Sequence, residues 1–178
     1  SNRYWDSSSQ SWVTPTETRN KISGLIVNGM GHSISGMNNC GLFEKNIKGY
    51  DLTLAHMVLD GDTFTNDYSA GSALLMDNAE RLRADNIVSN YKNAVGYHAG
   101  LFGTLKDGKI FNVVNNTSHG IYDGTGNIVY RSDTTNFQNV INNGSGRAGI
   151  AYTMNNGNII ASENNGNMQR AGFVENYN

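Results

Sequence analysis

Residues 28–54 read NGMGHSISGMNNCGLFEKNIKGYDLTL, and this stretch decides the fold. Its glycines recur at short intervals, a Gly-Leu-Phe unit follows, and apolar residues then alternate with polar ones. It holds no run of charge, no metal-ligand spacing and no nucleophile beside a base. Short apolar runs bounded by Gly and Asn are typical of β-strands joined by tight turns. The stretch therefore predicts strands and turns rather than a catalytic motif.

The same units recur further along the chain. A small residue, a glycine and mostly apolar residues follow one another at 40–43, 70–73, 99–102, 148–151 and 171–174. Leu52, Leu82, Ile110 and Ile159 follow the glycines of four of these units by 10 or 11 residues. Short strands with a period of roughly 20 to 30 residues predict an all-β chain coiled into a parallel β-helix, or β-solenoid, of about five to seven coils.

A further unit, Asn-apolar-apolar-x-Asn, occurs at 86–90, 112–116 and 139–143. The chain contains 27 Asn and 21 Gly, two residue types that tolerate the left-handed conformations of tight turns. We expect glycine at the corners of each coil. We also expect equivalent Asn side chains to form ladders of amide hydrogen bonds along the stack.

The remaining composition excludes several classes of protein. Only 16% of the residues are charged and the net charge is −2, which fits neither a disordered chain nor a nucleic-acid partner. The single Cys40 excludes an internal disulfide and occupies the small-residue position of its unit, which predicts a structural thiol. No apolar run is long enough for a membrane span, no signal peptide is recognisable, and no cofactor motif is present.

Three segments are open to more than one interpretation. Residues 1–21 contain both tryptophans, Trp5 and Trp12, and we interpret them as an N-terminal extended arm that packs on the solenoid domain of residues 22–178. Residues 74–88 fit either a helix or two strands, and the glycine spacing favours strands. The 49 residues between Gly100 and Gly149 imply an inserted loop over 116–147 or an unrecognised coil.

The segment from Asn28 to Met37 resembles the first part of the GLUG-type repeat of bacterial surface proteins. The Gly-Leu-Phe units at 41–43 and 100–102, and the run from Gly108 to Val113, are similar to the repeat itself. The resemblance covers about residues 22–178. It implies a right-handed β-solenoid within a large secreted or surface-attached bacterial protein, such as an adhesin or the non-catalytic part of an IgA-cleaving metallopeptidase. It transfers no catalytic residue, because the motif positions are structural.

A weak candidate for calcium binding is the predicted loop that contains Asp60, Asp62, Asn66 and Asp67. Calcium takes six to eight oxygen ligands, and this loop would supply three or four of them. The alternative is a solvated loop, which we favour, so no metal is expected. The four histidines, His32, His56, His98 and His119, lie outside any metallopeptidase motif, although His32 and His98 would fall on nearby coils.

A weak candidate for sugar stacking is a face of exposed tyrosines, which would consist of Tyr91, Tyr97, Tyr122, Tyr130 and Tyr152. Tyrosine is also common in strands, which is the alternative interpretation. Hydrolysis would need two carboxylates about 5 to 9 Å apart on one face. The charged residues considered for such chemistry are Asp107, Asp123, Asp133, Arg131 and Arg147.

The sequence favours a non-enzymatic extracellular module, an adhesin, stalk or binding surface of a bacterial surface protein, whose partner is a host-surface protein or a glycan. One alternative is a carbohydrate-active or carbohydrate-binding solenoid, such as a phage tailspike segment. Another is a filament subunit, because the ends of a solenoid are open strand edges that can pair with a second copy.

Overall fold

The structure is a computed structural model that describes residues 4–6, 11–13, 25–38, 41–45, 51–65, 73–96, 100–122 and 124–178. Residues 4–6 and 11–13 are described by their backbone alone. Every regular element among the described residues is a β-strand, which confirms the all-β prediction and the strand interpretation of residues 74–88.

The strands follow the chain in this order: β1 (Tyr4–Asp6), β2 (Ser11–Val13), β3 (Leu25–Asn28), β4 (Ser33–Ile34), β5 (Phe43–Lys45), β6 (Leu52–Thr65), β7 (Met76–Glu80), β8 (Leu82–Val95), β9 (Phe102–Lys106), β10 (Lys109–Asn115), β11 (Ser118–His119), β12 (Val129–Asn142), β13 (Gly146–Ala148), β14 (Ala151–Ile160), β15 (Glu163–Asn164), β16 (Met168–Ala171) and β17 (Val174–Tyr177). All of their ladders are parallel except the β1–β2 pair.

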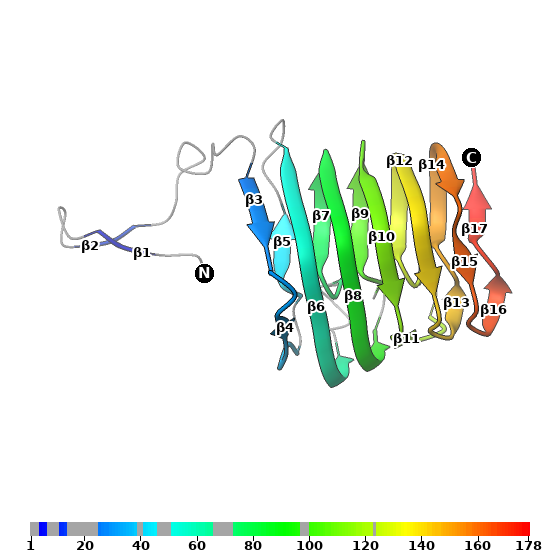
Figure 1. The fold of residues 1–178 in the computed structure, drawn as a ribbon, viewed down its shortest axis with the longest axis horizontal. Helices are drawn as coiled ribbons and strands as arrows, with labels where there is room; N and C mark the ends of the chain where they lie inside the picture. The colour runs from blue at the N-terminus through cyan, green and yellow to red at the C-terminus, as the bar shows by residue number, and fades with distance from the viewer. Residues whose placement is uncertain are drawn as a thin grey trace.

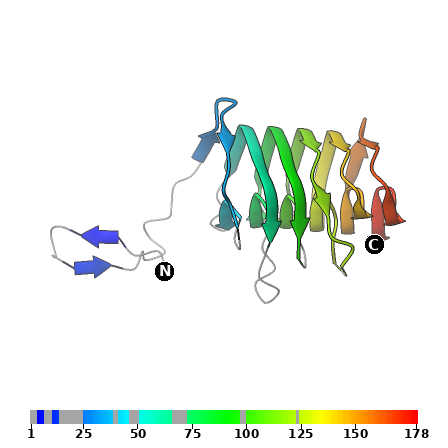
Figure 2. The same cartoon turned by 90° about the horizontal axis from the view of Figure 1, so that it is seen from below.

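The strands stack as a β-solenoid of about five turns, at the lower end of the predicted range. Figures 1 and 2 show the coils side by side along one axis, with the chain advancing from β3 to β17. These ladders define three faces of each coil. The first face consists of β5, β7, β9, residues 129–133, residues 151–155 and β17. The second face consists of β3 and residues 52–55, 82–85, 109–111, 135–138 and 157–160.

The third face follows directly on the same strands. It consists of β4, residues 57–60, 87–90, 113–115 and 140–142, and β15. Beyond it, β11 pairs with the end of β8, and β13 pairs with β16 in a separate short ladder. The long strands β6, β8 and β12 therefore each pass from the second face to the third.

Two rows of residues with left-handed backbones form the corners of the coils. The first corner row, between the first and second faces, contains Arg81, Asp107, Thr134 and Asn156. The second corner row, between the second and third faces, contains Met30, His56, Asn86, Asn112, Asn139 and Ala161, which recur at intervals of 26, 30, 26, 27 and 22 residues. From Arg81 onward the two corners of each coil lie five residues apart.

The prediction that glycine forms the corners is therefore only partly right. Gly31 and Gly36 of the opening stretch do have positive φ values, 77° and 76°. The repeated Gly100 is needed for a different reason, because a Cβ there would collide with the carbonyl oxygen of Gly126 on the next coil. Most corners are occupied by Asn and other polar residues, whereas this repeated glycine permits close approach between coils.

The core consists of inward side chains stacked in rows, as predicted. On the second face Leu54, Ala84, Ile110 and Phe137 form one buried row in register. Met57, Ile87, Val113 and Val140 form the equivalent row of the third face, and Met76, Phe102, Val129 and Ala151 that of the first. One detail of the predicted spacing is wrong: Ile110 is in register with Ala84 and Leu54, not with Leu82 and Leu52.

A ladder of buried asparagines continues the core beneath the third face. Asn115 Nδ2 donates to Asn142 Oδ1 at 2.8 Å, and Asn142 Nδ2 donates to Asn164 Oδ1 at 2.7 Å. On the preceding coil Ser89 takes the equivalent position and bonds to Thr117 through their hydroxyl groups at 2.6 Å. The predicted amide ladders are thus confirmed, and one of them is internal.

The segment 116–147 is a coil and not an inserted loop. Residues 129–133 pair with both β9 and β14, and an isolated bridge joins Gly126 to Ala148. Asn127 occupies the position that Gly100 and Gly149 hold on the neighbouring coils, which is why the glycine pattern misses this coil. Likewise Leu74, rather than Gly71, lies beside Gly100.

The N-terminal strands β1 and β2 form a small antiparallel ladder in which Trp5 lies opposite Trp12. These strands pair with each other and with no other strand that the structure describes. The predicted packing of the two tryptophan side chains on the solenoid concerns atoms outside the described part of the chain.

Candidate functional site

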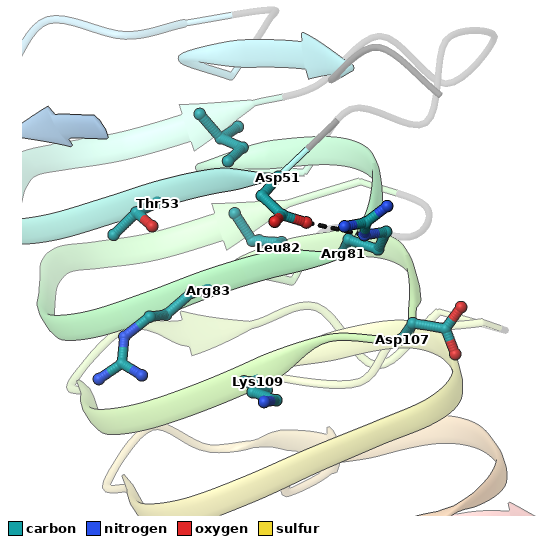
Figure 3. A pocket seen from close by; sticks show the side chains of 8 residues that line it. Asp51, Thr53, Arg81, Leu82, Arg83, Asp107 and Lys109 are labelled. Carbon is teal, nitrogen blue, oxygen red and sulfur yellow. Dashed lines mark ion pairs between the residues drawn. The ribbon is translucent and has the colours of Figure 1, made fainter. Parts of the chain in front are cut away.

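The second face carries a pocket of about 390 Å³ where it meets the first corner row. The pocket is lined by Asp51, Leu52, Thr53, Arg81, Leu82, Arg83, Asp107 and Lys109, and we call it the corner pocket. These residues come from three successive coils, and Figure 3 shows how their side chains gather along the turn. The parallel register brings together residues that lie 26 to 30 positions apart in the sequence.

One wall of the corner pocket alternates in charge along the stack. Arg81 Nε lies 2.7 Å from Asp51 Oδ1, and this ion pair is the dashed contact in Figure 3. Asp107 follows on the next coil, and its Oδ1 accepts a hydrogen bond of 2.6 Å from Thr134 Oγ1. The carboxylates of this wall are thus engaged by neighbours from the adjacent coils.

The other wall consists of Thr53, Arg83 and Lys109, which lie in register and point outward. Arg83 donates to Asp85 Oδ2 at 3.0 Å, and its guanidinium lies 4.9 Å from the ring centroid of Phe111. Both contacts fix the guanidinium against the sheet. Among the described residues no carboxylate pairs with Lys109, whose ammonium is therefore available to a ligand.

Asp85 links the corner pocket to the third face. Asn112 Nδ2 donates to Asp85 Oδ1 at 2.9 Å, and this bond is the main reason that the pKa of Asp85 is lowered. Partial burial opposes the shift, and the hydrogen bond and positive charge of Arg83 add to it. The carboxylate stays ionised at neutral pH and holds Arg83 in place.

The chemistry of the corner pocket suits binding. It offers cationic donors, carboxylate acceptors and a hydroxyl within one shallow surface, and these groups suit polar or charged ligands. Its two carboxylates, Asp51 and Asp107, already form contacts between coils. The pocket was not predicted, because its residues gather only once the register of the coils is known.

The predicted tyrosine face is divided among different environments. Tyr91 is only 2% exposed and belongs to the core, where its ring packs edge-on against Phe64 and its hydroxyl accepts the Met37 N–H at 3.0 Å. Tyr122 is 41% exposed and lies between β11 and β12. Tyr97 lies outside the described residues. Tyr91 is therefore removed from the candidate sugar-stacking residues.

Tyr130 and Tyr152 are brought together on the first face. Their rings stack with centroids 5.7 Å apart, and the Arg131 guanidinium lies 4.6 Å from the Tyr130 centroid. Arg147 lies 5.5 Å from the Tyr152 centroid and makes two bonds of 2.7 Å to Glu175. This half-buried cluster is the part of the predicted aromatic surface that the structure assembles.

Two of the four candidate calcium residues lie in a strand rather than in the predicted loop. Asp60 and Asp62 lie within β6, where the backbone pairs with β8, and Asp62 forms an ion pair with Lys92. Asn66 and Asp67 lie outside the described residues. Within the described ranges no group of three or more His, Cys, Asp or Glu residues could hold a metal ion.

The remaining candidates are dispersed. His32 is exposed, His56 bonds to Asn86 at the second corner row, and His119 is buried, whereas His98 and Cys40 lie outside the described residues. Asp133 and Arg131 point outward on the first face, one coil beyond Asp107. Asp123 also lies outside the described part. Of these candidate charges, Asp107 and Arg147 make contacts between coils, whereas Arg131 stacks on Tyr130 of its own strand.

Comparison of the chain with protein-family models found no match, and searches of curated proteins and of solved structures also found none. Among the described residues there is no helix long and apolar enough to cross a membrane.

Proposed function

We propose that this protein is a non-enzymatic repeat module that presents a rigid binding surface, as an adhesin or stalk segment of a secreted or surface-attached bacterial protein. One observation carries the proposal: outward side chains stand in register on successive coils, so each face displays fixed rows of polar groups. Rungs of a parallel sheet are spaced about 4.8 Å apart. Such rows suit a ligand that makes many weak, evenly spaced contacts.

The contacts of the charged side chains support a binding role over a catalytic one. Asp51 is paired with Arg81, Glu80 with Lys106, and Glu175 with Arg147, each across coils. General acid–base catalysis needs a carboxyl group that can exchange a proton with a substrate. The resemblance to GLUG-type repeats adds support for the extracellular role and for a host-surface protein or glycan as partner.

The test is a binding screen of the whole chain against immobilised glycans and host-surface proteins, with product analysis for any polysaccharide that binds. We expect binding without turnover. The variants Arg83→Ala and Lys109→Ala report on the corner pocket, and Thr104→Ala, an exposed residue of the first face, is the control. Release of oligosaccharides from an acidic polysaccharide would contradict the proposal.

A second candidate is a carbohydrate-binding solenoid that uses the stacked Tyr130–Tyr152 pair. Rings of this kind offer a flat apolar surface with a polar edge. The test is the affinity of Tyr152→Leu for the glycans that bind the native chain. Unchanged affinity would exclude this pair as the site.

A further inference from the structure

On its three central coils the third face, together with the second corner row beside it, presents a regular array of side chains without charge. The coils on either side carry the exposed Asp60 and Glu163. On the three central coils the outward positions are Asn86, Val88 and Asn90, then Asn112, Val114 and Asn116, then Asn139, Ile141 and Asn143. We call these nine residues the uncharged face. The β-branched residues form a half-buried stripe along the axis, and asparagines flank it on both sides.

The outer asparagines retain unused hydrogen-bonding capacity. Asn143 Nδ2 donates to Asn116 Oδ1 at 2.8 Å, and Asn116 Nδ2 donates to Asn90 Oδ1 at 2.8 Å. A side-chain amide has two N–H donors and a carbonyl oxygen with two lone pairs. Asn116 therefore keeps one N–H and one lone pair for a ligand, and the same pattern repeats at each rung.

The flanking asparagines and the stripe together define the chemistry of an occupant. Two residues along a strand separate the stripe from either row of asparagines by about 7 Å, and the rungs repeat about every 4.8 Å. An occupant would rest an apolar surface on Val88, Val114 and Ile141, and its polar edges would reach the amides on both sides. The absence of charge among these nine residues disfavours an ionic ligand.

The dimensions decide between a small occupant and a second copy of the chain. Four residue steps and three rungs give a face about 13 Å wide and about 14 Å tall, or about 190 Å². A stable protein interface buries about 800 Å² on each partner. The uncharged face is thus too small for a stable dimer, and the stripe that runs along it matches a short segment of a single extended polymer.

We propose that the uncharged face binds an extended, neutral polysaccharide chain that lies along the solenoid axis. In an equatorially linked sugar polymer the ring faces carry C–H groups and the edges carry hydroxyls. The C–H faces would rest on the stripe, and the hydroxyls would donate to and accept from the amides. This inference rests on the proposed binding function and specifies its ligand class.

The test is titration of the whole chain with cellohexaose, with an oligogalacturonate hexamer as the charged comparison, by calorimetry. Val114→Lys places an ammonium in the stripe, where a bound neutral chain would desolvate it, so we expect cellohexaose affinity to fall at least about tenfold. Asn116→Ala is a milder variant at an exposed position, and we expect it to weaken binding as well. Thr104→Lys adds the same charge to the first face and is expected to leave binding unchanged.

Three results would overturn the inference. If Lys109→Ala abolishes cellohexaose binding and the two third-face variants do not, the chain is a binding module that uses the corner pocket. If Val114→Lys abolishes a concentration-dependent rise in mass and cellohexaose does not bind, a second copy covers the face. If the native chain binds no glycan and no host-surface protein, the proposed function fails together with the inference.

Discussion

On the central coils the second and third faces are formed by the same strands, yet they present different chemistry to solvent. β6, β8 and β12 each cross from one face to the other without a break. Around the second face six charged residues surround the corner pocket: Asp51, Arg81, Arg83, Asp85, Asp107 and Lys109. The nine outward positions of the uncharged face contain none.

The two faces share the features that specify the fold and differ in the outward side chains that remain free for function. Both faces have apolar inward rows and left-handed corners, and these features repeat from coil to coil. The outward rows differ because the polar side chains of a parallel stack can be paired in two ways, by ion pairs between rungs or by ladders of amide hydrogen bonds. The contacts across rungs on each face predict how that face responds to mutation, salt and pH.

The largest effect is expected beneath the third face, at the buried ladder. Asn142→Ala removes the acceptor of one N–H from each of the buried Asn115 and Asn127, and a donor to the half-buried Asn164. Each buried polar group left without a partner costs about 1 to 3 kcal/mol, so we expect a loss of about 3 kcal/mol or more in urea unfolding. Asn143→Ala, one residue later on the exposed ladder, should cost less than about 1 kcal/mol. Equal losses would show that the internal ladder is not special.

The next effect concerns the two corner rows. Thr134 is a β-branched residue at φ 48°, whereas Asn139 has φ 54° in the second corner row. Asn tolerates this conformation and a β-branched residue does not, so Thr134→Asn should stabilise the protein by about 1 kcal/mol. The reciprocal variant Asn139→Thr should destabilise it by a similar amount. A loss of stability in Thr134→Asn would mean that the bond from Thr134 to Asp107 outweighs the backbone strain.

Salt should distinguish the two faces. The Asp51 and Arg81 side chains are 61% and 49% exposed, so their ion pair should contribute about 0.5 kcal/mol at low ionic strength. We expect Asp51→Asn to lose that amount in dilute buffer and little in about 1 M NaCl, where the screening length is about 3 Å. The cost of Asn143→Ala on the third face should not change with salt, and a parallel change in both variants would remove the distinction.

A smaller effect on stability is expected when the pH is lowered, through Asp85 at the boundary between the second and third faces. The pKa of Asp85 is lowered in the folded protein, chiefly by the Asn112 hydrogen bond. Its stabilisation is therefore complete above the ordinary aspartate pKa and is lost as the pH falls through the lowered folded value. We expect Asp85→Asn to be less stable than the native chain at pH 7, by under about 1 kcal/mol, and equally stable near pH 2. A difference that persists near pH 2 would assign it to packing.

Asp77 on the first face should give the opposite dependence of stability on pH. Burial raises its pKa, the Ala73 N–H opposes the shift, and the nearby charge of Glu44 adds to it. A raised pKa in a folded acid means that stability falls as the pH rises through the range between the unfolded and folded values. Asp77→Asn keeps the acceptor oxygen and should be slightly more stable than the native chain at pH 7, with no gain in acid. A loss at pH 7 would show that the Ala73 bond requires the charge.

The unit Asn-apolar-apolar-x-Asn shows how much the sequence contained. In Asn112–Asn116 the first Asn is the left-handed corner, Val113 points inward, Val114 points outward, and Asn116 joins the exposed ladder. This alternation, the coil period and the amide ladders were all predictable from the pattern. The coil at Asn127 was not, because an asparagine replaces the glycine and bonds to Asn142 instead.

The candidate sites depended on information that the sequence pattern does not carry. The corner pocket forms because the register of the coils places Arg81 beside Asp51, with Asp107 on the next coil. Since the coils differ in length, this register cannot be predicted from the sequence pattern. Tyr91 and Tyr130 are the same residue type, but the position of Tyr91 along its strand directs its side chain into the core. Residue type thus predicted the contacts poorly, whereas periodicity predicted the backbone well.

The buried asparagine ladder also gives the stack cooperativity between nearest neighbours. Asn142 Nδ2 donates to Gly144 O of its own turn and to Asn164 Oδ1 of the next coil, and Asn115 does the same with Thr117 and Asn142. A single amide therefore closes one coil and couples it to the following one. Hydrogen exchange should consequently show the stack opening one whole coil at a time. Each opening should stop where an amide of the ladder joins one coil to the next.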